Sequence, residues 1–324
     1  MCLEDNILVS LTQIEYIIAV DKFRHFGKAA QFCNISQPTL SQQIQKVEDS
    51  LSIIIFYRLQ KPIIPTDEGK KFIHQAKKVL KAHQELIYGV PSKLDSLSGI
   101  FRLGIIPTVS AYLVPLFIHN FSIKYPKITL YINELNTENI IRGINEDIID
   151  GAVLATPLKN ETFKEHPLYY ESFLLFSAKG EPLLNKNKIK QTDIDGAKMW
   201  MLQDGNCFKS QIAQFCSLKH EENTVIKNVR FQSGSLDTLC HVIKNNSGYT
   251  LIPELLSLQL GKEILEQHVR EFEPPIPSRE ISFVYRRDHW KINIIKAIKQ
   301  TIQESLPHQI KIVPSLNQKV LEIC

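Results

Sequence analysis

Apolar residues near the N-terminus recur at helical spacing. Residues 11–24 and 28–33 form two such segments, and a turn at 34–36 separates them from a third. The apolar positions of the third segment fall three or four residues apart, at Leu40, Ile44, Val47 and Leu51. Ser36 is a suitable N-cap, and Pro38 is tolerated because it falls in the first turn. The pattern predicts three short helices, the last two joined by a tight turn.

The opposite face of the third helix carries amides, hydroxyls and one cation. Such groups can read base edges in a major groove and hold phosphate, although an ordinary solvated face has a similar composition. Residues 58–66, with Pro62 and Pro65, predict a two-stranded wing whose basic residues could contact the DNA backbone. The candidate DNA-binding residues are Gln37, Pro38, Thr39, Ser41, Gln42, Gln45, Arg58 and Lys61.

From residue 67 the chain becomes polar and helical, with an apolar seam of heptad spacing. The seam consists of Ile73, Leu80, Ile87 and Leu94, with Ala76, His83 and Val90 between them. A heptad seam usually meets a partner helix, but this one could instead pack on its own domain. Gly89 and Pro91 should end or kink the helix. We expect a winged helix-turn-helix over 9–66 and a linker helix within 67–98.

The remaining two-thirds of the chain alternates between strand and helix patterns. The first set has strands at 100–106, 128–135 and 151–155 and helices at 113–124 and 138–146; the second has strands at 168–178, 200–204, 229–233 and 249–253 and a helix at 236–244. A strand at 280–287 and a helix at about 290–305 return to the first sheet. This alternation predicts an α/β fold with parallel strands and a ligand cleft between two lobes. We expect an effector domain over 99–306, with lobe I at 99–168 and 275–306, lobe II at 169–274, and a tail at 307–324.

Composition narrows the function classes. The chain has 324 residues, 44% of them hydrophobic and 22% charged, and a net charge of +4, which is too small to identify a nucleic-acid binder. Its six cysteines include no CxxC pair and no neighbouring histidine cluster, so neither a zinc site nor another cofactor is expected. The absence of a secretory pattern and of a long apolar run predicts a cytoplasmic protein without membrane contact. In that compartment a disulfide would be transient and regulatory.

Two cysteines lie nine positions apart in the segment LQDGNCFKSQIAQFC, residues 202–216. The spacing of Phe208, Ile212 and Phe215 predicts a short helix that starts near Cys207. Nine residues of helix rise about 13 Å, whereas a disulfide needs Cα atoms within roughly 7 Å. Cys207 and Cys216 could therefore bond only if the helix unwound. A helix N-terminus and nearby Lys209 favour the Cys207 thiolate, although either cysteine could simply be a small buried hydrophobe.

The N-terminal region closely resembles the winged helix-turn-helix of LysR-type transcriptional regulators. The strings that carry the resemblance are AAQFCNISQPTLSQQIQKVED and FYRLQKPIIPTDEG. Membership implies binding to pseudo-palindromic sites on double-stranded DNA, pairing through the linker helix into dimers or tetramers, and an effector domain like a periplasmic binding protein. It implies a regulator, not an enzyme.

The effector region resembles the hydrogen-peroxide-sensing OxyR subfamily in IPTVSAYLVP, NELNT, LQDGNCFKSQIAQFC, SLDTL and SGYTLIP. The resemblance implies that peroxide oxidises Cys207 to a sulfenic acid and that Cys216 then forms a reversible disulfide with it, which changes promoter binding at oxidative-stress genes. A glutaredoxin or thioredoxin system would reset it. The implied peroxide pocket contains Thr108, Thr137, Asn206, Lys209 and Arg279.

Three positions depart from the subfamily pattern, and they are Asn206, Ser210 and Asn133. Asn and Ser side chains are poor proton donors, so fewer groups are available to protonate the leaving oxygen or to tune the thiolate. Thr108 and Thr137 could equally cap helices, and Arg279 could form a surface ion pair. Two alternatives remain open: a LysR-type regulator of a small organic effector, with incidental cysteines, and a thiol peroxidase.

Overall fold

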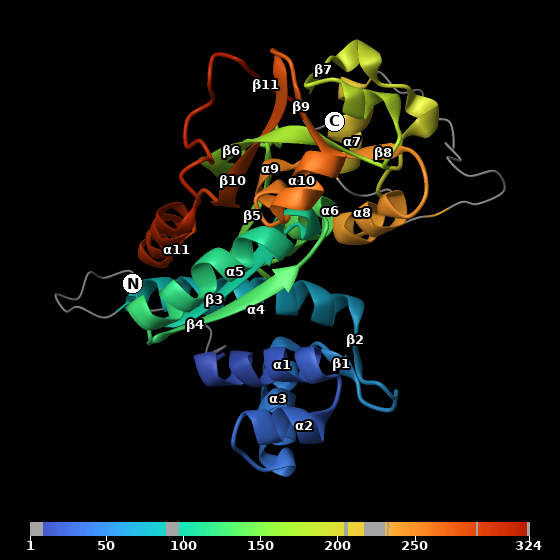
Figure 1. The fold of residues 1–324 in the computed structure, drawn as a ribbon. Coiled ribbons are helices and arrows are strands. Elements are labelled where there is room, and N and C mark those ends of the chain that lie inside the picture. The colour runs from blue at the N-terminus through green and yellow to red at the C-terminus, as the bar shows by residue number, and fades with distance from the viewer. Residues whose placement is uncertain are drawn as a thin grey trace. The chain divides into compact units, whose positions relative to one another are not determined.

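The computed structural model describes residues 9–88, 97–203, 207–216, 231, 233–289 and 291–322. The chain divides into two compact units, residues 1–94 and 95–324, and Figure 1 shows the elements of each. Among the described residues, no helix combines the length and the apolar composition needed to cross a membrane.

The first unit is a small helical domain with a two-stranded wing. Its elements are α1 (Leu11–Phe23), α2 (Phe26–Phe32), α3 (Gln37–Leu51), β1 (Phe56–Tyr57) and β2 (Ile64–Pro65), the strands pairing antiparallel. The Ser36 hydroxyl caps α3 by accepting the Thr39 N–H at 3.3 Å. Leu40, Ile44 and Val47 are buried in the core of this unit. The three helices and the wing that the sequence predicts are confirmed.

The linker helix α4 spans Asp67–Tyr88. Its first seam residues, Ile73 and Ala76, are buried, and Ile73 belongs to the core formed by α1 to α3. The start of the seam therefore packs on its own domain, which is one of the two alternatives that the heptad pattern allows. The side chain of Ile87, together with Val90 and Leu94, lies outside the described residues, so pairing through the linker stays a prediction.

The second unit begins with alternating strands and helices, as predicted. These are β3 (Gly99–Ile105), α5 (Pro107–Lys124), β4 (Ile128–Glu134), α6 (Thr137–Asn145) and β5 (Gly151–Thr156). Strand β3 pairs parallel with both β4 and β5. Helix α5 begins at Pro107, earlier than the predicted start at Leu113. Pro107 occupies the first turn, where its missing N–H costs nothing, and its N-cap residue Ile106 gives no capping signal.

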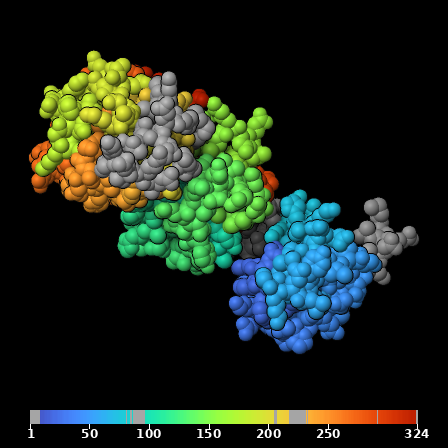
Figure 2. All heavy atoms as spheres, turned by 90° about the vertical axis from the view of Figure 1, so that its right-hand side faces the viewer, coloured from blue at the N-terminus to red at the C-terminus, as the bar shows by residue number. Residues whose placement is uncertain are grey.

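Two long strands, β6 (Phe163–Ser177) and β10 (Ile276–Arg286), pair antiparallel in the middle of the sheet. The beginning of β6 contacts β10, and its end pairs with β8 (Tyr249–Pro253) and β9 (Val269–Phe272). The strand order is β4-β3-β5-β10-β6-β9-β7, with β7 at Lys188–Ile189. Because β6 passes from one set of partners to the other, the unit has the predicted two-lobed α/β architecture. Figure 2 shows the lobes as adjoining masses, green for the first and yellow to orange for the second.

Within the described residues of the second lobe lie the helices α7 (Cys207–Phe215), α8 (Leu236–Lys244), α9 (Glu254–Ser257) and α10 (Lys262–His268). Short 3-10 turns lie at Pro182–Asn185, Gln191–Asp193 and Gly196–Lys198, and α11 (Ile292–Ser305) packs beside α5 in the first lobe. Strands predicted at 200–204 and 229–233 appear, where described, only as the isolated bridges Met199–Tyr249 and Leu202–Ser233. Residues 204, 229, 230 and 232 lie outside the described part of the chain.

The segment after Pro307 is more ordered than the predicted tail. Residues Gln318–Val320 form β11, which pairs parallel with the first residues of β10. Leu321 follows it and is buried in the effector core. Strand β11 contains a single apolar residue, Val320, so the sequence shows no strand period there, and only the structure shows that the segment joins the sheet.

Candidate functional site

A buried ion pair lies at the centre of the two long strands. Arg279 of β10 is opposite Glu171 of β6, and both side chains are at most 1% exposed. The Arg279 Nε and Nη2 atoms each lie 2.8 Å from Glu171 Oε1. Glu171 Oε2 also accepts the Leu255 N–H at 3.3 Å, at the start of α9. The expected alternative of a surface ion pair for Arg279 is therefore wrong.

Arg279 also donates to the first turn of α5. Its Nη1 contacts the Thr108 hydroxyl at 3.0 Å, and its Nη2 contacts the Thr108 carbonyl at 3.0 Å. Thr108 is buried and does not cap the helix, since the N-cap residue Ile106 has no side-chain cap bond. The structure thus brings two predicted pocket residues, Thr108 and Arg279, into direct contact.

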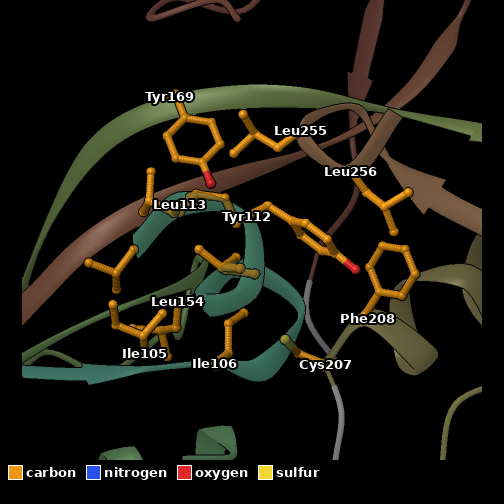
Figure 3. Close-up of a cluster of buried hydrophobic side chains, with 14 of the residues drawn as sticks. Ile105, Ile106, Tyr112, Leu113, Leu154, Tyr169, Cys207, Phe208, Leu255 and Leu256 are labelled. Carbon is orange, nitrogen blue, oxygen red and sulfur yellow. The ribbon is translucent and has the colours of Figure 1, made fainter. Parts of the chain in front are cut away.

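Cys207 is the first residue of α7, as the sequence predicts. It is 7% exposed, and Figure 3 shows its side chain among buried apolar groups, pointing toward Ile106 at the start of α5. The next residue, Phe208, is fully buried, and the Arg279 guanidinium lies over its ring, 4.9 Å from the centroid. The start of α7 therefore rests on the residue that also binds Thr108.

Cys216 follows the last residue of α7 and continues its hydrogen bonding, because its N–H donates to the Ile212 carbonyl at 2.9 Å. Burial raises the pKa of its thiol to about 12. Both cysteines are free. Since the residues between them are helical, they are held about 13 Å apart along the axis, too far for a disulfide. The predicted helix between the two cysteines is confirmed.

The other predicted pocket residues have mixed surroundings. Thr137 begins α6, but Asn136 supplies the cap by accepting the Asn139 N–H at 2.9 Å. The Thr137 hydroxyl oxygen is buried and has no hydrogen-bond partner among the described residues. Lys209 is partly buried, and Asn133 is exposed. Asn206 lies outside the described residues.

Sequence reasoning missed three residues that hold this site together. Glu171 pairs with Arg279, and Phe208 supports its other side. Tyr112 of α5 donates its hydroxyl to Asp237 of α8 at 3.0 Å, and burial followed by the Asp237 charge raises the tyrosine pKa. The available signal was the acid Glu171 inside the mostly apolar run predicted as a strand at 168–178, because a buried charge needs a partner.

The predicted DNA-binding residues lie on α3 and in the wing, and most of them are exposed. The exposed members are Gln37, Pro38, Thr39, Gln42, Gln45, Arg58 and Lys61. Arg58 also makes internal contacts, donating to the Ser41 hydroxyl at 3.1 Å and to the buried Glu48 carboxylate at 2.5 Å. The latter ion pair fixes the wing to α3, so Arg58 has a structural role besides any contact with phosphate.

No group of three or more His, Cys, Asp or Glu residues within the described ranges could hold a metal ion.

Models of two protein domains match the chain. Residues 11–70 match the bacterial regulatory helix-turn-helix of the lysR family, and residues 94–307 match the LysR substrate binding domain. The hydrogen peroxide-inducible genes activator of Haemophilus influenzae is 32% identical over 86% of this chain and 91% of its own length. The DNA-binding transcriptional dual regulator OxyR of Escherichia coli is also 32% identical, over 86% of this chain and 90% of its own.

Solved structures of similar proteins cover most of the chain. A cysteine-to-aspartate variant of full-length Pseudomonas aeruginosa OxyR has a TM-score of 0.75 and 25% identity, covering 92% of this chain and 99% of that one. A cysteine variant of Corynebacterium glutamicum OxyR with bound H2O2 has a TM-score of 0.59 and 25% identity, covering 91% and 92% of the two chains.

Proposed function

The chain belongs to the LysR family of bacterial regulators and within it to the OxyR group, and from this membership we propose that it is a hydrogen-peroxide-responsive transcriptional activator whose sensor is Cys207. The winged helix-turn-helix binds promoter DNA, and the effector unit converts peroxide into a change of conformation. The observation that carries the proposal is that an intact helix, α7, separates two free cysteines and contacts the buried Arg279 through Phe208.

The first chemical step consumes one peroxide molecule. The Cys207 thiolate attacks one oxygen, so that an S–O bond forms as the O–O bond breaks, and the departing hydroxide takes a proton to become water. Sulfur loses two electrons and peroxide gains them. Arg279 and Thr108 are suited to orienting peroxide and stabilising the charge on the departing oxygen, because their polar groups are fixed by burial and mutual hydrogen bonds. The Thr137 hydroxyl, without a partner among the described residues, is a further candidate.

The second step joins the two cysteines. The Cys216 sulfur attacks the Cys207 sulfenic acid, an S–S bond replaces the S–O bond, and the hydroxyl leaves as water with the thiol proton. While α7 is intact, Cys216 is out of reach and its raised pKa keeps it a neutral thiol. Unwinding of α7 brings the sulfurs together and removes the burial that raises this pKa. A glutaredoxin or thioredoxin system then reduces the disulfide.

Three departures bear on sensitivity. Asn206, Ser210 and Asn133 replace groups that would give acid-base help in the resembling regulators. We expect the chain to respond to peroxide more slowly than those relatives. Subunits associate as dimers or tetramers on pseudo-palindromic DNA, and oxidation changes the geometry of that assembly.

Peptide mass spectrometry after equimolar peroxide tests the proposal. The expected product is a peptide linked through Cys207 and Cys216, and Cys216→Ser should instead trap the Cys207 sulfenic acid. Cys240→Ser is the matched control, since Cys240 is also buried with a pKa raised to about 12, and it should leave the linked peptide unchanged. A wild-type chain with Cys207 over-oxidised and no linked peptide would contradict the mechanism.

One observation favours a second candidate function. Cys207 is only 7% exposed and lies among apolar side chains, as an incidental core cysteine would. A LysR regulator of a small organic effector would retain the peroxide response of its promoters, or lack one altogether, whether residue 207 is Cys or Ser. Loss of an existing response in Cys207→Ser excludes this candidate. A thiol peroxidase would destroy peroxide catalytically when a thiol reductant is supplied, whereas a sensor consumes about one equivalent for each reduction.

A further inference from the structure

The C-terminal segment reaches the helix between the two cysteines. It extends beyond residue 307, where the match to the LysR effector domain ends. Strand β11 pairs with Ile276–Ser278, immediately before Arg279, and the Leu321 N–H donates to the Ser278 carbonyl at 2.8 Å. Leu321 is buried, and its own carbonyl accepts a hydrogen bond at 3.0 Å from Nε2 of Gln211, in α7.

Gln211 is an unusual residue for its position. It is fully buried on α7, and its Oε1 has no hydrogen-bond partner among the described residues. Burying an amide oxygen without a partner is unfavourable, and an apolar side chain of similar size would avoid that cost. Stability of the fold alone therefore does not account for a glutamine here. Among the described residues, the bond to Leu321 is the side-chain hydrogen bond that distinguishes Gln211 from an apolar residue.

The segment that carries Leu321 is fixed to the long strands. The Tyr170 N–H donates to the Lys311 carbonyl at 2.7 Å, and Gln318 Nε2 donates to the Ser172 hydroxyl at 3.1 Å. Glu322 forms an ion pair with Lys159 at 2.6 Å. The partner of Gln211 thus belongs to the sheet and does not move as part of α7. Unwinding of α7 must break the Gln211 bond while the Leu321 carbonyl stays in place.

We propose that Gln211 is a positioning residue that connects α7 to the C-terminal strand and thereby sets how readily the Cys207–Cys216 disulfide forms. The proposal rests on the function proposed above. The bond exists in the helical, reduced form and is lost when α7 unwinds, so it stabilises the reduced form selectively. A chain without it should form the disulfide at a more negative potential, because its reduced state has lost that stabilisation.

The test measures the potential of the cysteine pair in full-length protein. Glutathione disulfide plus the two thiols gives the protein disulfide plus two glutathione molecules, so electrons and protons balance. Gln211→Met removes the bond while keeping the side-chain volume. Gln211→Met loses the bond but also removes the buried, unpartnered Oε1, so the contribution of the bond is the difference between the effect of this substitution on the wild-type chain and its effect on a chain with Leu321→Pro. We expect that difference to be roughly three- to tenfold in the equilibrium constant for disulfide formation, or about 15–30 mV in potential. Gln214→Met, at an exposed position of the same helix, is the matched control and should leave the potential unchanged.

A second variant tests the strand side of the contact. Leu321→Pro removes the N–H that donates to Ser278 and so displaces the carbonyl that Gln211 uses. It should shift the potential to a more negative value, and adding Gln211→Met to it should have an effect that differs from the effect on the wild-type chain by that three- to tenfold factor. Additive shifts in the double variant overturn the proposal while the sensor function stands. A wild-type chain that forms no Cys207–Cys216 disulfide overturns both.

Discussion

The candidate functional side chains of α3 are mostly exposed, whereas those of α7 are mostly buried. Helix α3 has 15 residues and a side-chain cap at Ser36, and its candidate DNA-reading groups face solvent. Helix α7 has nine residues, and those with a role in the proposed sensor, Cys207, Phe208 and Gln211, are buried. In α3, an apolar face packs on the core and holds the exposed polar groups in place. In α7, the candidate functional groups lie within the core itself.

This difference follows from what each helix must do. A recognition helix keeps its shape, so a cap and a regular core face suffice. An isolated helix as short as α7 is marginal in water, so its form depends on tertiary contacts. Those contacts include Phe208 with Arg279, Gln211 with Leu321, and the Phe215 carbonyl with the Gln191 amide. The proposed mechanism requires that such a helix unwind after Cys207 is oxidised.

The contact beneath α7 should give the largest effect. Arg279→Leu leaves Glu171 buried without its cation, which costs about 3–5 kcal/mol of unfolding free energy. Urea unfolding of the reduced chain measures the loss. The double variant Arg279→Leu with Glu171→Leu should recover much of it, because no unpaired charge remains. It should still react poorly with peroxide, and a double variant no more stable than the single one would contradict this account.

An exposed residue of α3 should affect binding without affecting stability. Gln42→Ala removes an amide that can read a base edge. The variant should bind a duplex selected by the wild-type protein with a free energy of binding about 1–3 kcal/mol weaker. Fluorescence anisotropy on that duplex and on a scrambled one measures the specific loss. Gln75→Ala, exposed on α4, is the matched control. An equal loss of affinity on both duplexes would mean that Gln42 does not read sequence.

Local signals in the sequence were sufficient for α3. Ser36, Pro38 and the spacing of Leu40 and Ile44 specify a capped amphipathic helix without knowledge of its neighbours. The start of α5 was missed because Ile106 carries no capping group. The apolar run at 200–202 predicts a strand in the second lobe, but in the structure it meets a neighbouring segment in a single bridge.

The site was only partly predictable for a related reason. The positions of Cys207 and Cys216 followed from their spacing on one helix, which is local information. The pairing of Arg279 with Glu171 depends on the register of β6 against β10, and these residues are far apart in the sequence. The contact of Gln211 with Leu321 depends on a strand that follows the recognisable domain. Non-local contacts of this kind leave almost no pattern in a single sequence.

The smallest expected effect concerns Cys216, a thiol buried at the end of α7. The buried Glu48 of α3, by contrast, is paired with Arg58. Burial raises the pKa of the Cys216 thiol from 9.0 to about 12. Below pH 9 the folded and unfolded chains both hold this proton. Between pH 9 and about 12 only the unfolded chain releases it, so stability falls as the pH rises, by at most about 1.4 kcal/mol per pH unit.

Comparing the wild-type chain with Cys216→Ala isolates this contribution. Urea unfolding of both reduced chains at pH 8 and pH 10 should show that the wild type loses up to about 1.4 kcal/mol more than the variant. Cys240, whose pKa is likewise raised to about 12 by burial and then by the Asp237 charge, is present in both chains and cancels in the difference. Equal losses would mean that Cys216 is as accessible in the folded chain as in the unfolded one. In that case α7 would not shield Cys216 from solvent, and only Cys207 and its neighbours would distinguish the buried face of α7 from the exposed face of α3.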